Sequence, residues 1–128
     1  MAPRRSVLAI RLGRRIVVLR GELAMTQEQL AWSADLGSKG YLSRIESGQR
    51  LPSLAVMERL ARSLQVEVRD LLLFPETSSM AMAMELMRQA GETGARSVID
   101  FIGELGQVTP ALRAAEPRGR VPTVRNRR

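Results

Sequence analysis

Apolar residues recur every three or four positions in several segments of the chain, which is the spacing of one face of an α-helix. In the first such segment this face consists of Leu8, Leu12, Ile16, Leu19 and Leu23. No stretch alternates apolar and polar residues as a half-exposed strand does, and no segment repeats another. The chain is therefore predicted to be all-α, with a leading helix that packs on the helices after it.

Two short helices separated by a tight turn are predicted in the segment TQEQLAWSADLGSKGYLSRIESGQ. Thr26 and Gln29 have the spacing of a capping box, in which two side chains satisfy free backbone donors of the first turn. Residues 35–37 (Asp-Leu-Gly) end this helix. Ser38 then caps a second helix, which Gly48 stops.

The second helix has two different faces. Leu42 and Ile45 lie on one face, three residues apart, and are expected in the core. The opposite face is short near the start of the helix and carries two cations; it consists of Lys39, Gly40, Ser43 and Arg44. A face of this kind suits insertion into the major groove of DNA.

A fourth helix opening at Pro52 and a fifth around residues 68–74 complete a compact domain. Pro75 marks the end of the fifth helix. We expect this five-helix domain to span residues 1–76.

A helical extension is predicted for residues 77–108. It has a first helix with a methionine-rich face, a break at Gly91 and Gly94, and a second apolar helix. Two helices this short cannot form a core of their own, so their apolar faces must cover the domain or pair with a second copy. Because methionine adapts to irregular partners, we predict that residues 80–105 contribute to a homodimer. Packing within one chain is the alternative.

These segments resemble the Cro/CI-type helix-turn-helix family of bacterial and phage regulators, also called the xenobiotic-response-element family. The resemblance extends from about Leu12 to Phe74 and includes LGRRIVVLR, TQEQLA, YLSRIESGQRLPS and VMERLARSLQVEVRDLL. It implies a lambda-repressor-like domain that binds double-stranded DNA sequence-specifically and regulates transcription. It further implies a dimer on a palindromic operator, with the recognition helix near residues 38–47 in the major groove.

The resemblance also implies a role for each matching position. Gln27 matches a glutamine that binds phosphate and supports the recognition side chains, and Arg44 is expected to make a bidentate guanine contact worth about 1–3 kcal/mol of discrimination. Gln49 and Arg50 are expected on phosphates, which fix the register without reading sequence. The full set of expected DNA contacts is Gln27, Ser38, Lys39, Gly40, Tyr41, Ser43, Arg44, Gln49 and Arg50.

Simpler roles are open for some of these residues. Ser38 can be a helix cap alone, and Arg44 can be an ordinary solvated arginine. Tyr41, expected against the DNA backbone or a thymine methyl, can instead pack on Leu30 or Trp32.

Arg20 and Glu46 match a family pair that forms a partly buried salt bridge, and we assign this pair to stability. Two departures from the family pattern bear on the turns. Ala24 stands where the family usually has glycine, and a left-handed alanine costs about 1–2 kcal/mol. The turn between the two short helices is one residue longer than the commonest version, which leaves the phase of residues 38–40 open by one position.

Composition narrows the function classes. The 128 residues include no cysteine and no histidine, which excludes disulfides and removes the commonest general base and metal ligand. No nucleophile–base set, paired carboxylates or phosphate-binding loop is present, so no enzyme activity, cofactor or metal site is expected. No apolar run is long enough to cross a membrane, and arginines interrupt any signal peptide. The cytoplasm is the expected compartment, with nucleoid association when DNA is bound.

The net charge of +7 comes from the two ends of the chain. Residues 1–21 carry six arginines and no acid, residues 109–128 carry a net charge of +5, and the residues between them carry −4. Basic ends around an acidic body suit phosphate binding. Residues 109–128, with three prolines and few apolar residues, are expected to form a basic disordered tail. The tail either binds DNA or only keeps the chain in solution.

One functional alternative comes from another class. The chain could be an antitoxin or another protein-interaction module that also represses its own operon. In that case residues 77–128 would bind a second protein.

Overall fold

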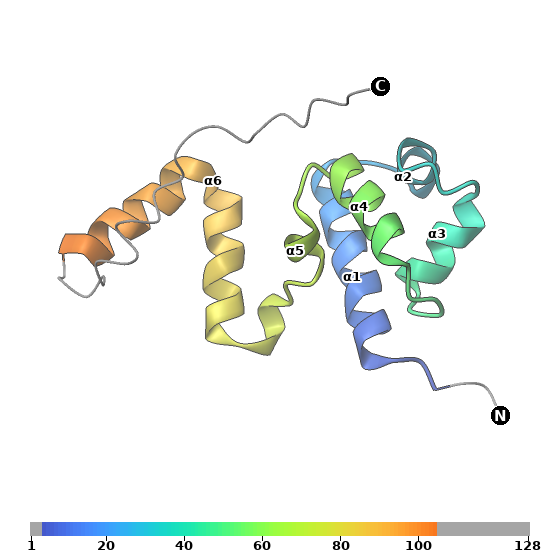
Figure 1. The fold of residues 1–128 in the computed structure, drawn as a ribbon, viewed down its shortest axis with the longest axis horizontal. Helices are drawn as coiled ribbons and strands as arrows, with labels where there is room; N and C mark the ends of the chain where they lie inside the picture. The colour runs from blue at the N-terminus through green and yellow to red at the C-terminus, as the bar shows by residue number, and fades with distance from the viewer. Residues whose placement is uncertain (1–3, 105–128) are drawn as a thin grey trace, which may run out of the picture. The chain divides into compact units, whose positions relative to one another are not determined.

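The computed structural model describes residues 4–104, and every regular element in that range is helical (Figure 1). The elements are α1 (Val7–Glu22), α2 (Gln27–Ser33), α3 (Lys39–Glu46), α4 (Leu54–Ser63), α5 (Val68–Leu71), a 3-10 turn (Pro75–Thr77) and α6 (Ser79–Glu104). This order confirms the prediction of an all-α chain with a five-helix domain and a helical extension. The predicted tail, residues 109–128, lies outside the described residues.

The chain divides into two compact units, with the boundary between Leu86 and Met87. The first unit contains α1 to α5 and the first turns of α6, so it extends past residue 76. The division of the sequence at residues 76 and 108 stays a prediction.

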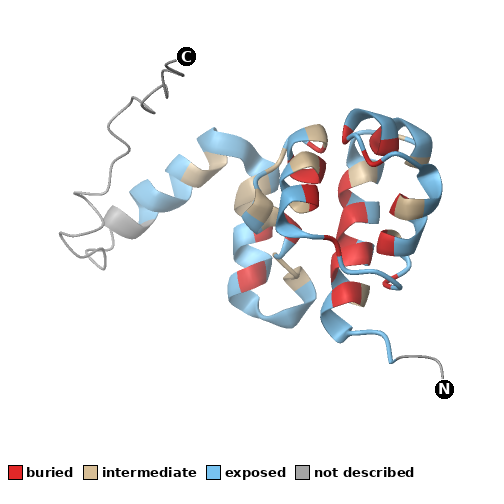
Figure 2. Cartoon of the chain, turned by 45° about the vertical axis from the view of Figure 1, so that its right-hand side comes forward, coloured by how far each residue is buried: buried red, intermediate tan, exposed pale blue. Residues whose placement is uncertain are grey.

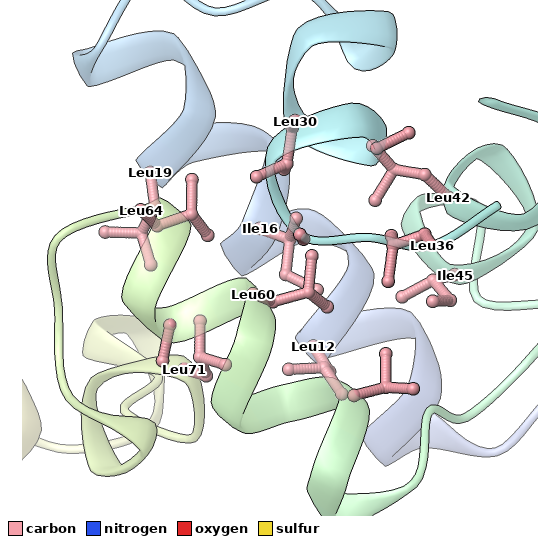
Figure 3. Close-up of a cluster of buried hydrophobic side chains, with 14 residues drawn as sticks. Leu12, Ile16, Leu19, Leu30, Leu36, Leu42, Ile45, Leu60, Leu64 and Leu71 are labelled. Carbon is pink, nitrogen blue, oxygen red and sulfur yellow. The ribbon is translucent and has the colours of Figure 1, made fainter. Parts of the chain in front are cut away.

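The core of the first unit is built around α1, which contacts both α3 and α5. Leu12, Ile16 and Leu19 are almost fully buried, as the spacing predicts. Leu8 and Leu23, at the two ends of the same predicted face, are 43% and 37% exposed. Figure 3 shows the core side chains converging from the helices and the α2–α3 turn; those labelled are Leu12, Ile16, Leu19, Leu30, Leu36, Leu42, Ile45, Leu60, Leu64 and Leu71.

The start of α2 has the capping box that the sequence predicts. The Thr26 hydroxyl accepts a hydrogen bond from the Gln29 backbone N–H at 3.1 Å, and the Gln29 side chain accepts one from the Thr26 backbone N–H at 2.8 Å. At the start of α3, the Ser38 hydroxyl accepts a hydrogen bond from the Tyr41 backbone N–H at 3.1 Å. The boundaries of both helices are therefore fixed by local polar contacts.

Two glycines allow the end of α3 to lie directly on α1. A Cβ added at Gly13 would overlap the carbonyl oxygens of Ile45, at 2.5 Å, and Glu46. A Cβ added at Gly48 would lie 2.8 Å from the Ile10 Cα, and the φ angle of Gly48 is +73°. The C-terminal end of α3 is thus pressed against the backbone of α1, with no side chain between them.

Helix α6 contains a kink at Gly91, where φ is 69° and ψ is −168°. This is the position at which the glycines predict a break between two helices. Figure 2 shows buried residues gathered on the facing sides of α1 to α5, whereas α6 is mostly exposed. Homodimer formation through residues 80–105 stays a prediction.

Candidate nucleic-acid interface

Helix α3 presents the face that the sequence predicts. Leu42 and Ile45 are fully buried, and the side chains expected to read DNA point away from the core. The exposed set comprises Ser38, Lys39, Gly40, Ser43 and Arg44. Ser38 is the N-cap and Gly40 the second residue of the helix, so two small residues lie at its start and allow that end to approach base edges closely.

Glu46, the last residue of α3, ties this helix to both α1 and α2. Its carboxylate accepts hydrogen bonds from Arg20 Nε at 2.8 Å, Arg20 Nη2 at 3.2 Å and Gln27 Nε2 at 2.6 Å. The Glu46 side chain is only 5% exposed. A third nitrogen of Arg20, Nη1, donates to the Met25 carbonyl at 2.8 Å. The expected Arg20–Glu46 pair is therefore part of a network that orients α3 from its buried side.

Gln27 has a structural partner within this network. The amide nitrogen carries two N–H groups, and it donates to Glu46. The bond to Glu46 uses one of these N–H groups and leaves the other for the phosphate contact that is expected of Gln27.

Lys39 forms an ion pair across the α2–α3 turn. Its Nζ lies 3.0 Å from Glu28 Oε1, and the two side chains are 55% and 70% exposed. Exposed pairs of this kind contribute at most about 1 kcal/mol. Lys39 can therefore leave Glu28 for a phosphate or a base at small cost.

The loop after α3 is folded back onto that helix. The backbone N–H groups of Gln49 and Arg50 both donate to the Arg44 carbonyl, at 2.9 and 3.1 Å. The guanidinium of Arg50 lies over the Tyr41 ring, with its Cζ 5.3 Å from the ring centroid, and Tyr41 itself packs partly buried against the core. The Tyr41 ring therefore lies between the core and Arg50 and supports the guanidinium. The sequence does not predict this contact.

The N-terminal arginines have divided roles. Arg15 and Arg20 are used in internal ion pairs, so they do not add to an exposed basic surface. Arg5 donates from Nη1 to the Ser47 carbonyl at 3.3 Å, which places its charge at the C-terminal end of α3. Sequence reasoning missed both the Arg15 pair and the Arg5 contact, because neither partner is near in sequence.

Trp32, the chain's one tryptophan, is 86% exposed. It lines an open hollow of about 290 Å³ beside the α2–α3 turn, together with Glu28 and Lys39. It is not part of the core cluster.

Within the residues that the structure describes, no group of acidic side chains is placed to hold a metal ion. No helix in the same range is long and apolar enough to span a bilayer.

Residues 11–73 match the family model of a helix-turn-helix domain. Residues 11–73 therefore form a helix-turn-helix domain. This match confirms the prediction of a Cro/CI-type helix-turn-helix DNA-binding domain. In this domain α2, the turn and α3 correspond to the predicted helix-turn-helix unit, and α3 is the helix predicted to contact DNA.

Two individual proteins are similar to the helix-turn-helix chain. It is 42% identical over 57 residues to the immunity repressor protein of Bacillus phage phi105, a match that covers 44% of this chain and 39% of that repressor. It is 35% identical to the restriction-modification controller protein C.AhdI from Aeromonas hydrophila, whose crystal structure gives a TM-score of 0.48. That similarity covers 49% of this chain and 94% of the controller protein.

Proposed function

We propose that this chain is a sequence-specific transcriptional regulator that binds double-stranded DNA as a homodimer, with α3 in the major groove. The observation that carries the proposal is the exposed polar face of α3 on a helix fixed from behind. The Glu46 network and the close approach at Gly13 hold its buried side. A rigidly held recognition helix loses little conformational freedom on binding, which favours specific contacts.

The roles of the exposed residues follow from their places on α3 and in the loop after it. Arg44 and Lys39 carry the donors suited to guanine edges in the major groove. Gln49 and Arg50, held at the C-terminal end of α3, carry donors suited to phosphates. Ser43 and Gly40 keep the centre of the face short enough to approach the bases.

Exposed apolar side chains on α6 support the homodimer. Met80, Leu86, Ile99 and Phe101 are each at least 57% exposed, and burial of such surface against a second copy favours association. A symmetric dimer places two recognition helices in successive major grooves, with half-site centres about 10 base pairs or 34 Å apart. Such binding would occur on the nucleoid, in the cytoplasm, and would block or recruit RNA polymerase.

The test is selection of bound sequences from a random DNA pool, with the unmodified chain and Arg44→Ala in parallel. We expect a two-fold symmetric motif that loses one base preference in each half-site in the variant. Arg62→Ala, which removes an exposed arginine of α4, is the matched control and should leave the motif unchanged. Unchanged specificity in Arg44→Ala would contradict the proposed reading role.

Two of the same exposed side chains, both in the second unit, are also compatible with a second function. Ile99 and Phe101 are 60% and 61% exposed, which suits binding of a different protein, as an antitoxin does. Sedimentation of the purified chain separates the two proposals. A dimer at micromolar concentration supports self-association, whereas a monomer favours a partner of another sequence.

A further inference from the structure

A buried ion pair joins α1 to the first turns of α6. Arg15 Nη1 donates to Glu85 Oε1 at 3.0 Å, and Arg15 Nη2 donates to Glu85 Oε2 at 2.6 Å. Arg15 Nε also donates to the backbone carbonyl of Asp70 at the α5 side, at 2.8 Å. The side chains of Arg15 and Glu85 are only 4% and 5% exposed. Three elements therefore meet at one guanidinium inside the first unit.

Apart from this pair, few side chains in the first turns of α6 are buried against the domain. Among residues 79–86 only Ala81 and Glu85 are buried, at 9% and 4% exposure. The larger apolar side chains of the same stretch are 42% to 70% exposed: Met80, Met82, Met84 and Leu86. None of them joins the buried core, so apolar packing holds this part of α6 less firmly than it holds the helices of the core.

An ion pair and an apolar contact constrain a helix differently. A methyl group can slide over an apolar surface with little change in energy. A guanidinium bound through two parallel hydrogen bonds to a carboxylate allows essentially one relative orientation. Buried pairs of this kind are often no more stabilising than apolar replacements, and their best-attested use is to fix one geometry among several. The Arg15–Glu85 pair therefore suits the task of setting the direction of α6.

Helix α1 links this pair to the recognition helix. Gly13, two residues before Arg15, is where the end of α3 lies on the α1 backbone. Two residues along a helix correspond to a rotation of roughly 200°, so α3 and α6 are held on opposite sides of the same helix. Any rotation of α6 about its anchor changes its direction relative to α3.

We propose that Arg15 and Glu85 are positioning residues for DNA recognition. They fix the direction of residues 79–86 of α6 within the first unit, and thereby the distance between the two recognition helices of a dimer joined through the exposed apolar side chains of that segment. The chain's preference for one half-site spacing depends on this ion pair. This inference rests on the proposed dimeric function.

The test compares spacing preference in the full chain and in Arg15→Met/Glu85→Leu. The double variant removes both charges and leaves apolar side chains of similar size, so the fold should persist. Both proteins are measured against DNA carrying two selected half-sites separated by a series of spacers. We expect the unmodified chain to favour one spacer, and the variant to lose about tenfold of that preference, which corresponds to roughly 1.4 kcal/mol. Affinity for an isolated half-site should stay unchanged.

A matched control removes an exposed ion pair instead. Arg69 and Glu67 form a pair of 3.1 Å in which both side chains are at least 68% exposed. Arg69→Met/Glu67→Gln should keep the original spacer preference. If Arg15→Met/Glu85→Leu also keeps it and shows only a lower melting temperature, the pair is merely structural and the inference is wrong.

Failure of the proposed function gives a different result. If the unmodified chain itself enriches only isolated half-sites, the dimer is wrong and the inference fails with it, before any variant is compared.

A second measurement reads the position of α6 directly. Because the chain has no cysteine, Val18→Cys and Ala83→Cys introduce two unique labelling positions on exposed residues of α1 and α6. Spin-label distances, recorded with excess unlabelled chain, should be narrowly distributed with the ion pair and broad without it. Glu85→Gln, which keeps the side-chain shape, serves if the double variant does not fold. An equally narrow distribution in a folded variant would overturn the proposal.

Discussion

Arg20 and Glu46 lie 26 residues apart in sequence and share two hydrogen bonds, of 2.8 and 3.2 Å. Glu46 is the last residue of α3, and Arg20 lies in the last turn of α1. The pair therefore fixes the C-terminal end of α3 on the side away from its exposed face. Residues behind the interface should affect DNA binding through the orientation of α3.

Glu46→Ala should lower the free energy of unfolding by about 3 kcal/mol, because Arg20 and Gln27 lose their shared acceptor inside the domain. Urea unfolding followed by circular dichroism measures this change. Arg62→Ala, at an exposed position of α4, should stay within about 0.5 kcal/mol of the unmodified chain. A loss below about 1 kcal/mol for Glu46→Ala, the range of surface pairs, would mean that apolar contacts alone hold α3.

Replacing either of two glycines of α1 with alanine should change the stability of the domain, in opposite directions at the two positions. Gly13→Ala should destabilise the domain and weaken DNA binding, since its Cβ would overlap backbone oxygens of α3. Gly21→Ala should stabilise it by up to about 1 kcal/mol, because nothing lies within 4 Å of its added Cβ. Thermal melts of both variants and a DNA titration measure the contrast. Equal effects at the two positions would contradict the close approach of α1 and α3.

Ala24→Gly should stabilise the chain by about 0.5–1 kcal/mol, because an L-residue with a left-handed backbone is strained. Ala24 has a φ angle of 51°, as its place in the family pattern suggests. Ala83→Gly, at an exposed position within α6, should instead destabilise it by up to about 1 kcal/mol. Chemical unfolding of both variants checks the sign, and a destabilised Ala24→Gly protein would rule out strain at this turn.

Tyr41 should act on DNA binding through Arg50. Tyr41→Phe keeps a ring beneath the guanidinium and should keep the salt dependence of DNA affinity. Tyr41→Leu removes that ring and should lower affinity by about 0.5–1 kcal/mol. Arg50→Ala should reduce the slope of log affinity against log salt concentration by about 1. Fluorescence titrations at several salt concentrations measure all three. If Tyr41→Phe and Tyr41→Leu bind DNA with the same affinity and salt dependence, the ring has no role in supporting Arg50.

The local features of the domain could be predicted because their causes are local. The capping box at Thr26 and Gln29 needs two residues three apart, and the buried side of α3 needs only Leu42 and Ile45. Periodicity also indicates which side of α1 faces the core. It does not say how far neighbouring helices cover that side, which is why Leu8 and Leu23 are exposed at its ends.

The contacts that place α6 could not be predicted from the sequence. Arg15 stands among arginines that together suggest a phosphate-binding surface, and Glu85 lies 70 residues away. An acidic residue within a methionine-rich helix gives the only hint of an internal partner. The pairing is a property of the folded chain, because it needs α1, α5 and α6 to meet at one point.

The two ends of α3 are constrained very differently. Its C-terminal end rests on the α1 backbone at Gly13 and is bonded through Glu46, whereas Lys39, Gly40 and Ser43 are exposed. If α3 reads DNA as proposed, substitutions at its exposed end change the sequence that is read without lowering the stability of the domain. Because the exposed start of α3 and its buried end are separate, descendants of one ancestral gene can acquire new target sites through a few substitutions at the exposed start. The fold that they inherit stays the same.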